Sequence, residues 1–247
     1  MPSPTIVLVH GAFGDASSWR QVYDRLVNDG HTVLAPPNPL RGIPYDASFT
    51  ASVVDQIDGP VVLVGHSYGG AVISNAATQA ANVVGLVYVA AFATEEGETL
   101  GEVAGSSKDS VLNSALVTHH YPTGGGEPAV ELTIDPAKFR HAFAADLPAE
   151  TAALMAATQR PIANSAFGEP GGPPAWKHLP TWAVVATGDK AAGADVVRSM
   201  AERAGAKITE VEGSHVIMVS QPQAVTDVIL EAAAEVGRAA KHLAGAT

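Results

Sequence analysis

The chain has 247 residues, 47% of them hydrophobic and 16% charged, with a formal net charge of −11 and no cysteine. This composition allows a sizeable core, in one domain or with one large insertion, and it disfavours disorder. The acidic balance disfavours nucleic acid and anionic membrane surfaces as partners, and the lack of cysteine excludes disulfides and thiolate chemistry. With no basic leader and no apolar run of membrane-spanning length, the sequence predicts a cytoplasmic protein.

Short apolar runs that alternate with helical patterns fill the first part of the chain. Strands are expected at residues 5–10, 31–37, 60–65 and 83–92, and helices at 18–30, 47–57 and 68–81. The strands are continuous runs rich in β-branched residues, which is typical of strands buried on both faces.

The alternation stops after the fourth strand and resumes near residue 180. Between these points lie two loop-like stretches, TGGGEP and FGEPGGPPAW, and two predicted helices at residues 136–145 and 148–159. Strands are then expected at 181–188 and 206–213, and helices at 195–204 and 222–243.

Six such strands predict an α/β fold with a mainly parallel six-stranded sheet flanked by helices. We expect residues 1–93 and 179–247 to form the core, and residues 94–178 to form a helical cap inserted after the fourth strand. Ligands of open parallel sheets bind at the carboxyl ends of the strands, so an insertion leaving from that end is positioned to cover the site.

The stretch VVLVGHSYGG places Ser67 between the third predicted strand and the following helix. A bare Gly-x-Ser-x-Gly pattern is weak, but a strand-to-helix turn is the setting of a nucleophile elbow. The turn is too sharp for ordinary side chains, and Gly65, Gly69 and Gly70 remove the Cβ atoms that would collide there. The pattern therefore predicts Ser67 as a nucleophile.

A nucleophilic serine needs a base and an orienting acid. His215 follows the last predicted strand, and Asp189 lies just past the carboxyl end of the strand before it. Asp195 is the alternative acid, although its place at the start of a helix favours a capping role. The order Ser67, Asp189, His215 is one of the three common orders of such triads.

An oxyanion hole needs two backbone donors. One is expected to be the N–H of Tyr68, directly after the nucleophile. The other should come from the loop HGAFGD after the first strand, from Ala12 or Phe13. We favour Phe13, whose ring would also face the pocket.

The stretches HGAFGDASSW, VVLVGHSYGGAVI, GLVYVAAF, FAADLP, PAWKHLPTW and GSHVIMVSQP resemble small bacterial α/β-hydrolases related to plant methyl-ester esterases and hydroxynitrile lyases. The resemblance spans nearly the whole chain. It implies an α/β-hydrolase fold, a helical cap over about residues 94–178, and no metal or organic cofactor. It also supports Ser67, His215 and Asp189 as triad, with Phe13 and Tyr68 as oxyanion donors.

Two positions depart from the lyase branch of that family. The lyases have a threonine where this chain has Gly11, and a lysine where it has Val216. Hydrolysis of a small-molecule ester is therefore favoured over cyanohydrin cleavage. Perhydrolase or haloperoxidase-type activity, and a non-catalytic protein that binds a small ligand, are the alternatives. The expected pocket residues indicate a small to medium apolar ester, and they are Phe13, Tyr68, Phe139, Phe143, Leu147 and Trp176.

Overall fold

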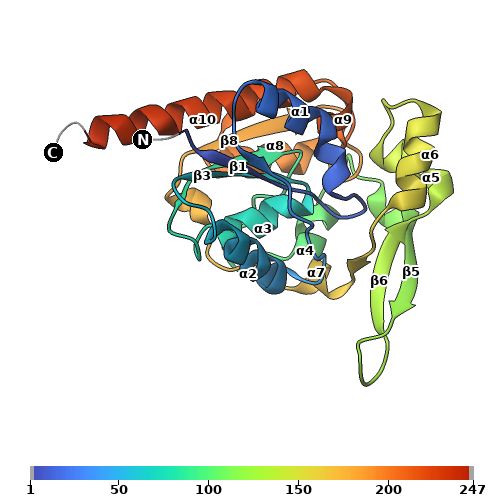
Figure 1. Cartoon of the computed structure of the whole chain (residues 1–247). Coiled ribbons are helices and arrows are strands. Elements are labelled where there is room, and N and C mark those ends of the chain that lie inside the picture. Colours follow the sequence, from blue (N-terminus) through green and yellow to red (C-terminus); the bar gives the residue numbers. More distant parts are fainter. Residues whose placement is uncertain (1–2, 245–247) are drawn as a thin grey trace.

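The computed structural model describes residues 3–244, and its centre is a six-stranded sheet in the order β2-β1-β3-β4-β8-β9 (Figure 1). The strands are β1 (Thr5–Val9), β2 (Val33–Leu34), β3 (Val61–His66), β4 (Val83–Val89), β8 (Thr181–Ala186) and β9 (Lys207–Val211). All neighbouring pairs are parallel. The predicted parallel sheet is thus confirmed.

Helices cover both faces of the sheet, which is why the central strands are apolar on both sides. The helices of the core are α1 (Arg20–Asn28), α2 (Ile43–Val54), α3 (Tyr68–Ala76), α8 (Ala194–Arg203), α9 (Ile217–Ser220) and α10 (Pro222–Ala244), with a 3₁₀ turn, η1 (Ala16–Trp19), before α1. In Figure 1, α1 and α10 lie above the sheet, and α2 and α3 lie below it.

Helix α2 begins earlier than the sequence pattern predicts. It starts at Ile43 instead of residue 47, with Gly42 as its N-cap and Pro44 in its first turn. Proline is tolerated there because the first turn of a helix needs no N–H donor.

The segment between β4 and β8 is more varied than a helical insertion. Its elements are α4 (Leu100–Gly105), η2 (Leu112–Ala115), β5 (Leu116–Tyr121), β6 (Ala129–Ile134), α5 (Pro136–Phe143), α6 (Ala149–Thr158), β7 (Ile162–Ala163), α7 (Ser165–Gly168) and η3 (Ala175–Lys177). Helices α5 and α6 are the two that the sequence predicts. The antiparallel sheet β5-β6-β7 is not predicted, and its β5–β6 hairpin extends away from the core in Figure 1.

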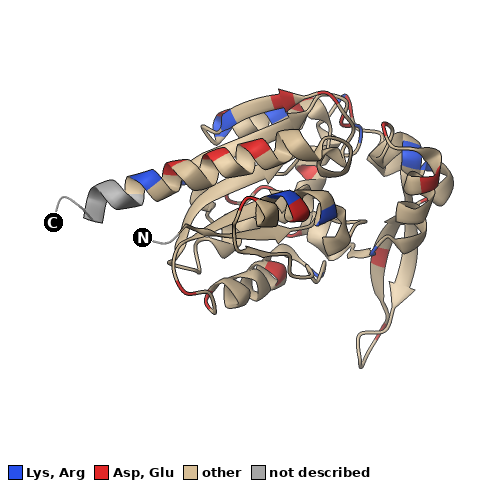
Figure 2. Ribbon diagram, turned by 45° about the horizontal axis from the view of Figure 1, so that its top comes forward, with Lys and Arg blue, Asp and Glu red and all other residues tan. Residues whose placement is uncertain are grey.

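Acidic residues recur along the outer side of α10 (Figure 2). Lys207 on β9 pairs there with Glu231 and Glu235. Within residues 3–244, the structure contains no helix that is both long and apolar enough to span a bilayer.

Candidate active site

Ser67 lies at the sharp turn between β3 and α3, at the carboxyl edge of the sheet. Its backbone has φ 54° and ψ −124°, a left-handed conformation that residues with a side chain rarely adopt. Its carbonyl accepts hydrogen bonds from Gly70 N at 2.9 Å and Phe92 N at 3.1 Å. The surrounding chain therefore holds the serine in a strained position, as a nucleophile elbow requires.

The glycines around Ser67 allow three backbone segments to meet. A Cβ on Gly65 would lie 2.6 Å from the Gly69 carbonyl oxygen, and one on Gly69 would lie 2.5 Å from the Val9 oxygen. A Cβ on Gly70 would lie 2.6 Å from the Phe92 oxygen. These contacts are too short for any larger residue, so the glycines let α3 approach β1 and β4 closely.

His215 and Asp189 form a buried pair. The Nδ1 atom of His215 lies 2.8 Å from Oδ2 of Asp189, and each residue is 1% exposed. The other carboxylate oxygen of Asp189 accepts hydrogen bonds from the N–H groups of Ala191, at 2.8 Å, and Ala192, at 3.0 Å. Because the carboxylate can only accept, it fixes the His215 proton on Nδ1 and leaves Nε2 free to take another.

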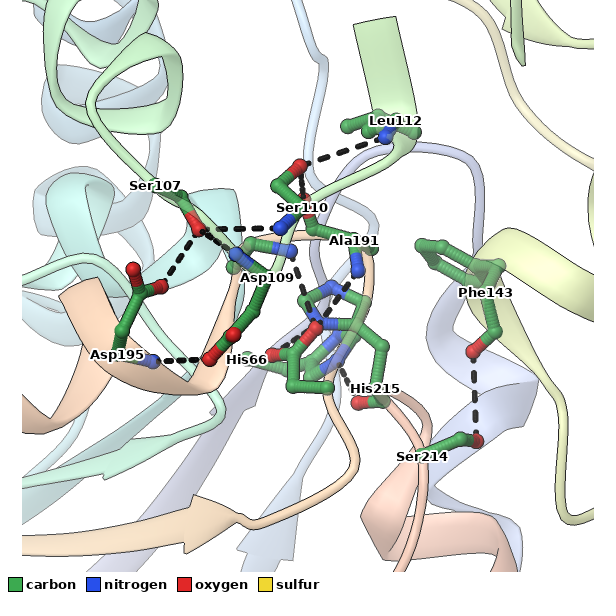
Figure 3. Close-up of polar contacts among 12 residues, drawn as sticks. His66, Ser107, Asp109, Ser110, Leu112, Phe143, Ala191, Asp195, Ser214 and His215 are labelled. Atoms are coloured by element: carbon green, nitrogen blue, oxygen red, sulfur yellow. Dashed lines mark hydrogen bonds and ion pairs between the residues drawn. The ribbon is translucent and has the colours of Figure 1, made fainter. Parts of the chain in front are cut away.

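Asp195, the alternative acid, has other partners. Its carboxylate accepts hydrogen bonds from Ser107 Oγ at 2.5 Å and from Lys108 N at 2.8 Å, and its N–H donates to Asp109 (Figure 3). Gly193 occupies the N-cap position of α8. Asp195 therefore ties the insertion to the start of α8. Of the two aspartates, Asp189 is the one hydrogen-bonded to His215.

The two oxyanion candidates after β1 differ in the use of their N–H groups. The Phe13 N–H donates to the Arg160 carbonyl of the insertion at 3.2 Å. The structure gives the Ala12 N–H no hydrogen-bond partner among the described residues. Because an N–H without a carbonyl partner is the better placed donor, this geometry favours Ala12 over the predicted Phe13. Tyr68 begins α3, so its N–H has no partner inside the helix.

The Tyr68 side chain has a fixed partner that the sequence does not reveal. Its hydroxyl donates to Oδ2 of Asp46 at 2.7 Å, and the fully buried carboxylate also accepts from the Arg41 N–H. Burial raises the pKa of Asp46 above its usual range. Asp46 lies within helix α2, and no local motif distinguishes it from a surface aspartate.

Two further histidines, His66 and His10, are buried and uncharged at neutral pH. The His66 Nε2–H donates to the His215 carbonyl at 3.0 Å (Figure 3), and the two rings are 4.7 Å apart. Burial, followed by the neighbouring His215, lowers the pKa of His66 well below its usual range. His10 accepts a hydrogen bond from Asn38 N on Nε2 at 2.9 Å, and burial lowers its pKa to about 4.

Unfolding should become easier as the pH falls from 6.5 toward about 4, because His10 is neutral in the fold and protonates when the chain unfolds. The stability is complete above the unfolded pKa and is lost as the pH falls through the folded one. We expect His10 to contribute a loss of roughly 3 kcal/mol over that range. Thermal unfolding between about pH 7 and pH 4 measures it, and His10→Gln should make the dependence shallower while the contribution of His66 remains. An equally steep dependence in the variant would contradict this assignment.

Ser67 and His215 open on the same small cavity, whose volume is about 20 Å³. Its other lining residues are Ala12, Phe13, Tyr68, Phe92, Leu100, Ala104, Leu112, Phe143, Phe167, Ala191 and Ala192. Four residues of the insertion were expected in the pocket, and of these Phe143 lines the cavity. Phe139 packs behind Phe143 with ring centroids 5.1 Å apart, and Trp176 donates to the Thr94 carbonyl. Leu147 is buried elsewhere. The sequence pattern does not indicate Leu100, Leu112 and Phe167, which line the cavity from short elements.

The insertion also holds the loop that carries His215. The Asp146 carboxylate accepts hydrogen bonds from Ser214 N, at 2.9 Å, and from Ser214 Oγ. The Phe143 ring lies 4.9 Å from the His215 ring, and its carbonyl accepts from Ser214 Oγ at 3.4 Å (Figure 3). A Cβ on Gly213 would lie 2.8 Å from Asp146, so the glycine makes room for the carboxylate.

Removing the Asp146 carboxylate should lower kcat, because the peptide preceding His215 would lose its support. We expect Asp146→Ala to reduce kcat by about 10- to 100-fold, with a smaller change in KM. Asp146→Asn keeps one oxygen that can accept from the Ser214 N–H, so its kcat should lie between those of the wild type and Asp146→Ala. Asp135→Ala is the control, since Asp135 caps α5 in the same insertion without touching the His215 loop. Wild-type kcat in Asp146→Ala would show that this contact is only structural.

The chain is similar to one protein family over most of its length and to a bacterial esterase over part of it. A model described as "Alpha/beta hydrolase family" matches residues 6–228. A carbendazim hydrolyzing esterase of Nocardioides sp. (strain SG-4G) is 34% identical over 110 residues, which span 38% of this chain and 44% of that protein. The chain thus matches less than half the length of this curated relative.

Solved structures share the fold over almost their whole length. Polyneuridine aldehyde esterase superposes with a TM-score of 0.77 at 22% identity, covering 93% of this chain and 99% of that one. A pyrethroid hydrolase from Sphingobium faniae JZ-2 gives a TM-score of 0.74 at 21% identity, covering 93% and 97%. With the family match over residues 6–228 and the parallel sheet that carries Ser67 at its carboxyl edge, the chain belongs to the alpha/beta hydrolase family.

Proposed function

We propose that this protein is a carboxylic-ester hydrolase that uses Ser67, His215 and Asp189 through an acyl-enzyme. The observation that carries the proposal is the arrangement at one cavity. Ser67, held at a strained strand-to-helix turn, opens on the same cavity as His215, and His215 is bonded to the buried Asp189. A nucleophile, a base and an orienting acid are what acyl transfer to serine requires.

In the proposed mechanism, Nε2 of His215 takes the hydroxyl proton as Ser67 attacks the ester carbonyl. The N–H groups of Tyr68 and Ala12 stabilise the oxyanion, because neither has a hydrogen-bond partner among residues 3–244. His215 then protonates the leaving alcohol. Water next attacks the acyl-serine with His215 as the base, which releases the carboxylic acid and restores the Ser67 hydroxyl. Asp189 holds the imidazole and stabilises its charged form.

The neutral state of His66 supports this assignment. Its ring is 4.7 Å from that of His215, so a charge on His66 would oppose the imidazolium that forms during catalysis. Burial keeps His66 neutral, and its Nε2–H fixes the His215 carbonyl. The base is thus supported from both sides, by His66 and by the Asp146–Ser214 contact.

Residues 94–178 are proposed to act as the cap of this site. Phe143, Leu100 and Leu112 from this segment close the cavity over Ser67. Ser107 and Ser110 bind the chain around Asp189 and α8, since Ser110 Oγ donates to the Ala191 carbonyl at 2.6 Å (Figure 3). The cap thereby fixes both loops that carry the acid and the base.

Cyanohydrin cleavage is disfavoured by two residues at the site. Val216 is fully buried and uncharged next to His215, so it offers nothing to a departing cyanide. A Cβ on Gly11 would lie 2.7 Å from the Cβ of Ser67 and 2.8 Å from the His66 carbonyl. A threonine therefore has no room at residue 11 unless the elbow moves.

Turnover of p-nitrophenyl esters, with and without prior reaction with a fluorophosphonate, tests the proposed function. The proposal expects release of p-nitrophenol by wild-type protein, and its loss in proportion to covalent labelling of Ser67. Turnover that survives complete labelling would contradict it. A folded protein that neither labels nor turns over any ester would be a ligand-binding member of the family.

A further inference from the structure

Two cavities meet at Phe13. The inner chamber is the cavity of about 20 Å³ that holds Ser67 and His215. The outer chamber, of about 230 Å³, lies between the start of α1 and helix α6 of the insertion. Its walls include Asp15, Ser18, Gln21, Met155, Thr158 and Val219. Phe13 lines both chambers, so its side chain forms a partition between them.

The backbone holds this partition in an unusual conformation. Phe13 has φ 60°, which is uncommon for a residue with a bulky side chain and costs of order 1 kcal/mol or more. Its N–H is tied to the Arg160 carbonyl of the insertion, and its ring meets that of Phe143 edge-on, with centroids 6.1 Å apart. The side chain is 2% exposed. Core and insertion together therefore hold the ring between the chambers.

The chambers differ in size and in polarity. The inner one has room for about one water molecule, and apolar side chains surround Ser67 there. The outer one combines the apolar Met155 and Val219 with polar side chains, and its Gln21 and Thr158 are exposed to solvent. A small apolar group fits the inner chamber, whereas a larger group with both polar and apolar surface fits the outer one.

We propose that Phe13 is a specificity-determining residue, which limits the acyl group to a small one and directs a larger alcohol group to the outer chamber. The proposal rests on the proposed ester hydrolysis. After attack, the acyl group stays on Ser67 inside the enclosed chamber, while the alcohol must leave. The outer chamber reaches exposed side chains, so it provides the path by which the alcohol departs.

The first test measures kcat/KM for p-nitrophenyl esters from acetate to octanoate. Wild-type protein should prefer the shortest acyl chains. Phe13→Ala widens the opening between the chambers and should raise the octanoate-to-acetate ratio of kcat/KM by about tenfold or more, since each added methylene of the acyl chain then contacts apolar wall. Phe13→Leu keeps most of the partition and serves as the matched control, with a much smaller shift.

A second variant tests the outer chamber without touching Phe13. Met155→Trp fills that chamber from α6 and should raise KM for acetates of bulky alcohols by about tenfold. Leu154→Trp is the control, because Leu154 is the neighbouring residue and its side chain points to solvent, with 65% of the residue exposed. It should leave the kinetics unchanged.

The outcomes separate this proposal from the function on which it rests. Labelling of folded Phe13→Ala by a fluorophosphonate at the wild-type rate would show that Ser67 still reacts. If the octanoate-to-acetate ratio of kcat/KM is then unchanged, Phe13 does not limit the acyl group and the proposal is wrong. Equal kinetics of Met155→Trp and Leu154→Trp would overturn the outer subsite. If wild-type protein turns over no ester at all, the proposed function fails first, and this assignment fails with it.

Discussion

Replacing Ser67 with alanine should reduce kcat for ester hydrolysis by about 10⁴-fold or more, because it removes the hydroxyl that forms the proposed acyl-enzyme. The cavity around it is otherwise lined by apolar groups, Tyr68 and His215. Alanine keeps a Cβ at φ 54°, so we expect the melting temperature to change little. Steady-state turnover and thermal unfolding of the purified variant measure both effects.

Glycine at residue 67 separates the chemical role from the backbone strain. Ser67→Gly should be as inactive as Ser67→Ala, but glycine adopts a left-handed φ at no steric cost. We expect it to be more stable than the alanine variant by about 1 kcal/mol, a rise of about 2–4 °C in Tm for a chain of this size. Equal melting temperatures for the two variants would contradict the strain at the elbow.

Asp189→Asn should lower kcat by about 10³- to 10⁴-fold with little effect on the fold. The asparagine oxygen can still accept from the N–H groups of Ala191 and Ala192, which turns the amide NH₂ toward His215. Nδ1 of His215 must then accept, so its proton moves to Nε2, the atom that should take the proton of Ser67. Activity should therefore fall because the imidazole adopts the wrong tautomer, and the loss should appear in kcat.

Asp195→Asn is the matched control for that variant. Its carboxylate binds Ser107 and Lys108 of the insertion and does not meet His215, so we expect less than about a threefold change in kcat. A large loss in Asp195→Asn together with a small one in Asp189→Asn would reverse the assignment of the acid.

The sheet and the elbow could be predicted because their signals are local and strong. Continuous apolar runs predicted β1, β3, β4 and β8, and each strand begins within two residues of its expected first residue. Gly65 and Gly69 flank Ser67 in this pattern, since close backbone contact leaves no room for a side chain at either glycine. His215 and Asp189 followed from their places after successive strands.

The insertion was harder to predict. Strand β5 is largely exposed and β6 is only partly buried, and the glycine-rich turn between them was interpreted as a plain loop. Its alternation of Val130, Leu132 and Ile134 was the available signal, because Leu132 and Ile134 are buried. A strand with one apolar face gives a weaker pattern than a strand buried on both.

Contacts made over long distances in the chain carry no local pattern. Asp46 meets Tyr68, and Asp146 meets Ser214, only after the chain has folded. The choice between Ala12 and Phe13 as oxyanion donor depended in the same way on Arg160, which lies far along the chain in the insertion. Sequence reasoning limited the donor to these two residues and favoured Phe13, because it could not reveal this contact.

The central claim is that Ser67 is acylated during turnover, and intact mass measurement after rapid quenching tests it most directly. Wild-type protein mixed with p-nitrophenyl acetate should gain about 42 Da, the mass of one acetyl group less the hydrogen it replaces, and digestion should place that gain on the peptide that contains Ser67. The adduct should decay as free acetate forms, and Ser67→Ala should show none. Hydrolysis that continues in Ser67→Ala, or an acetyl group found on another residue, would contradict the account.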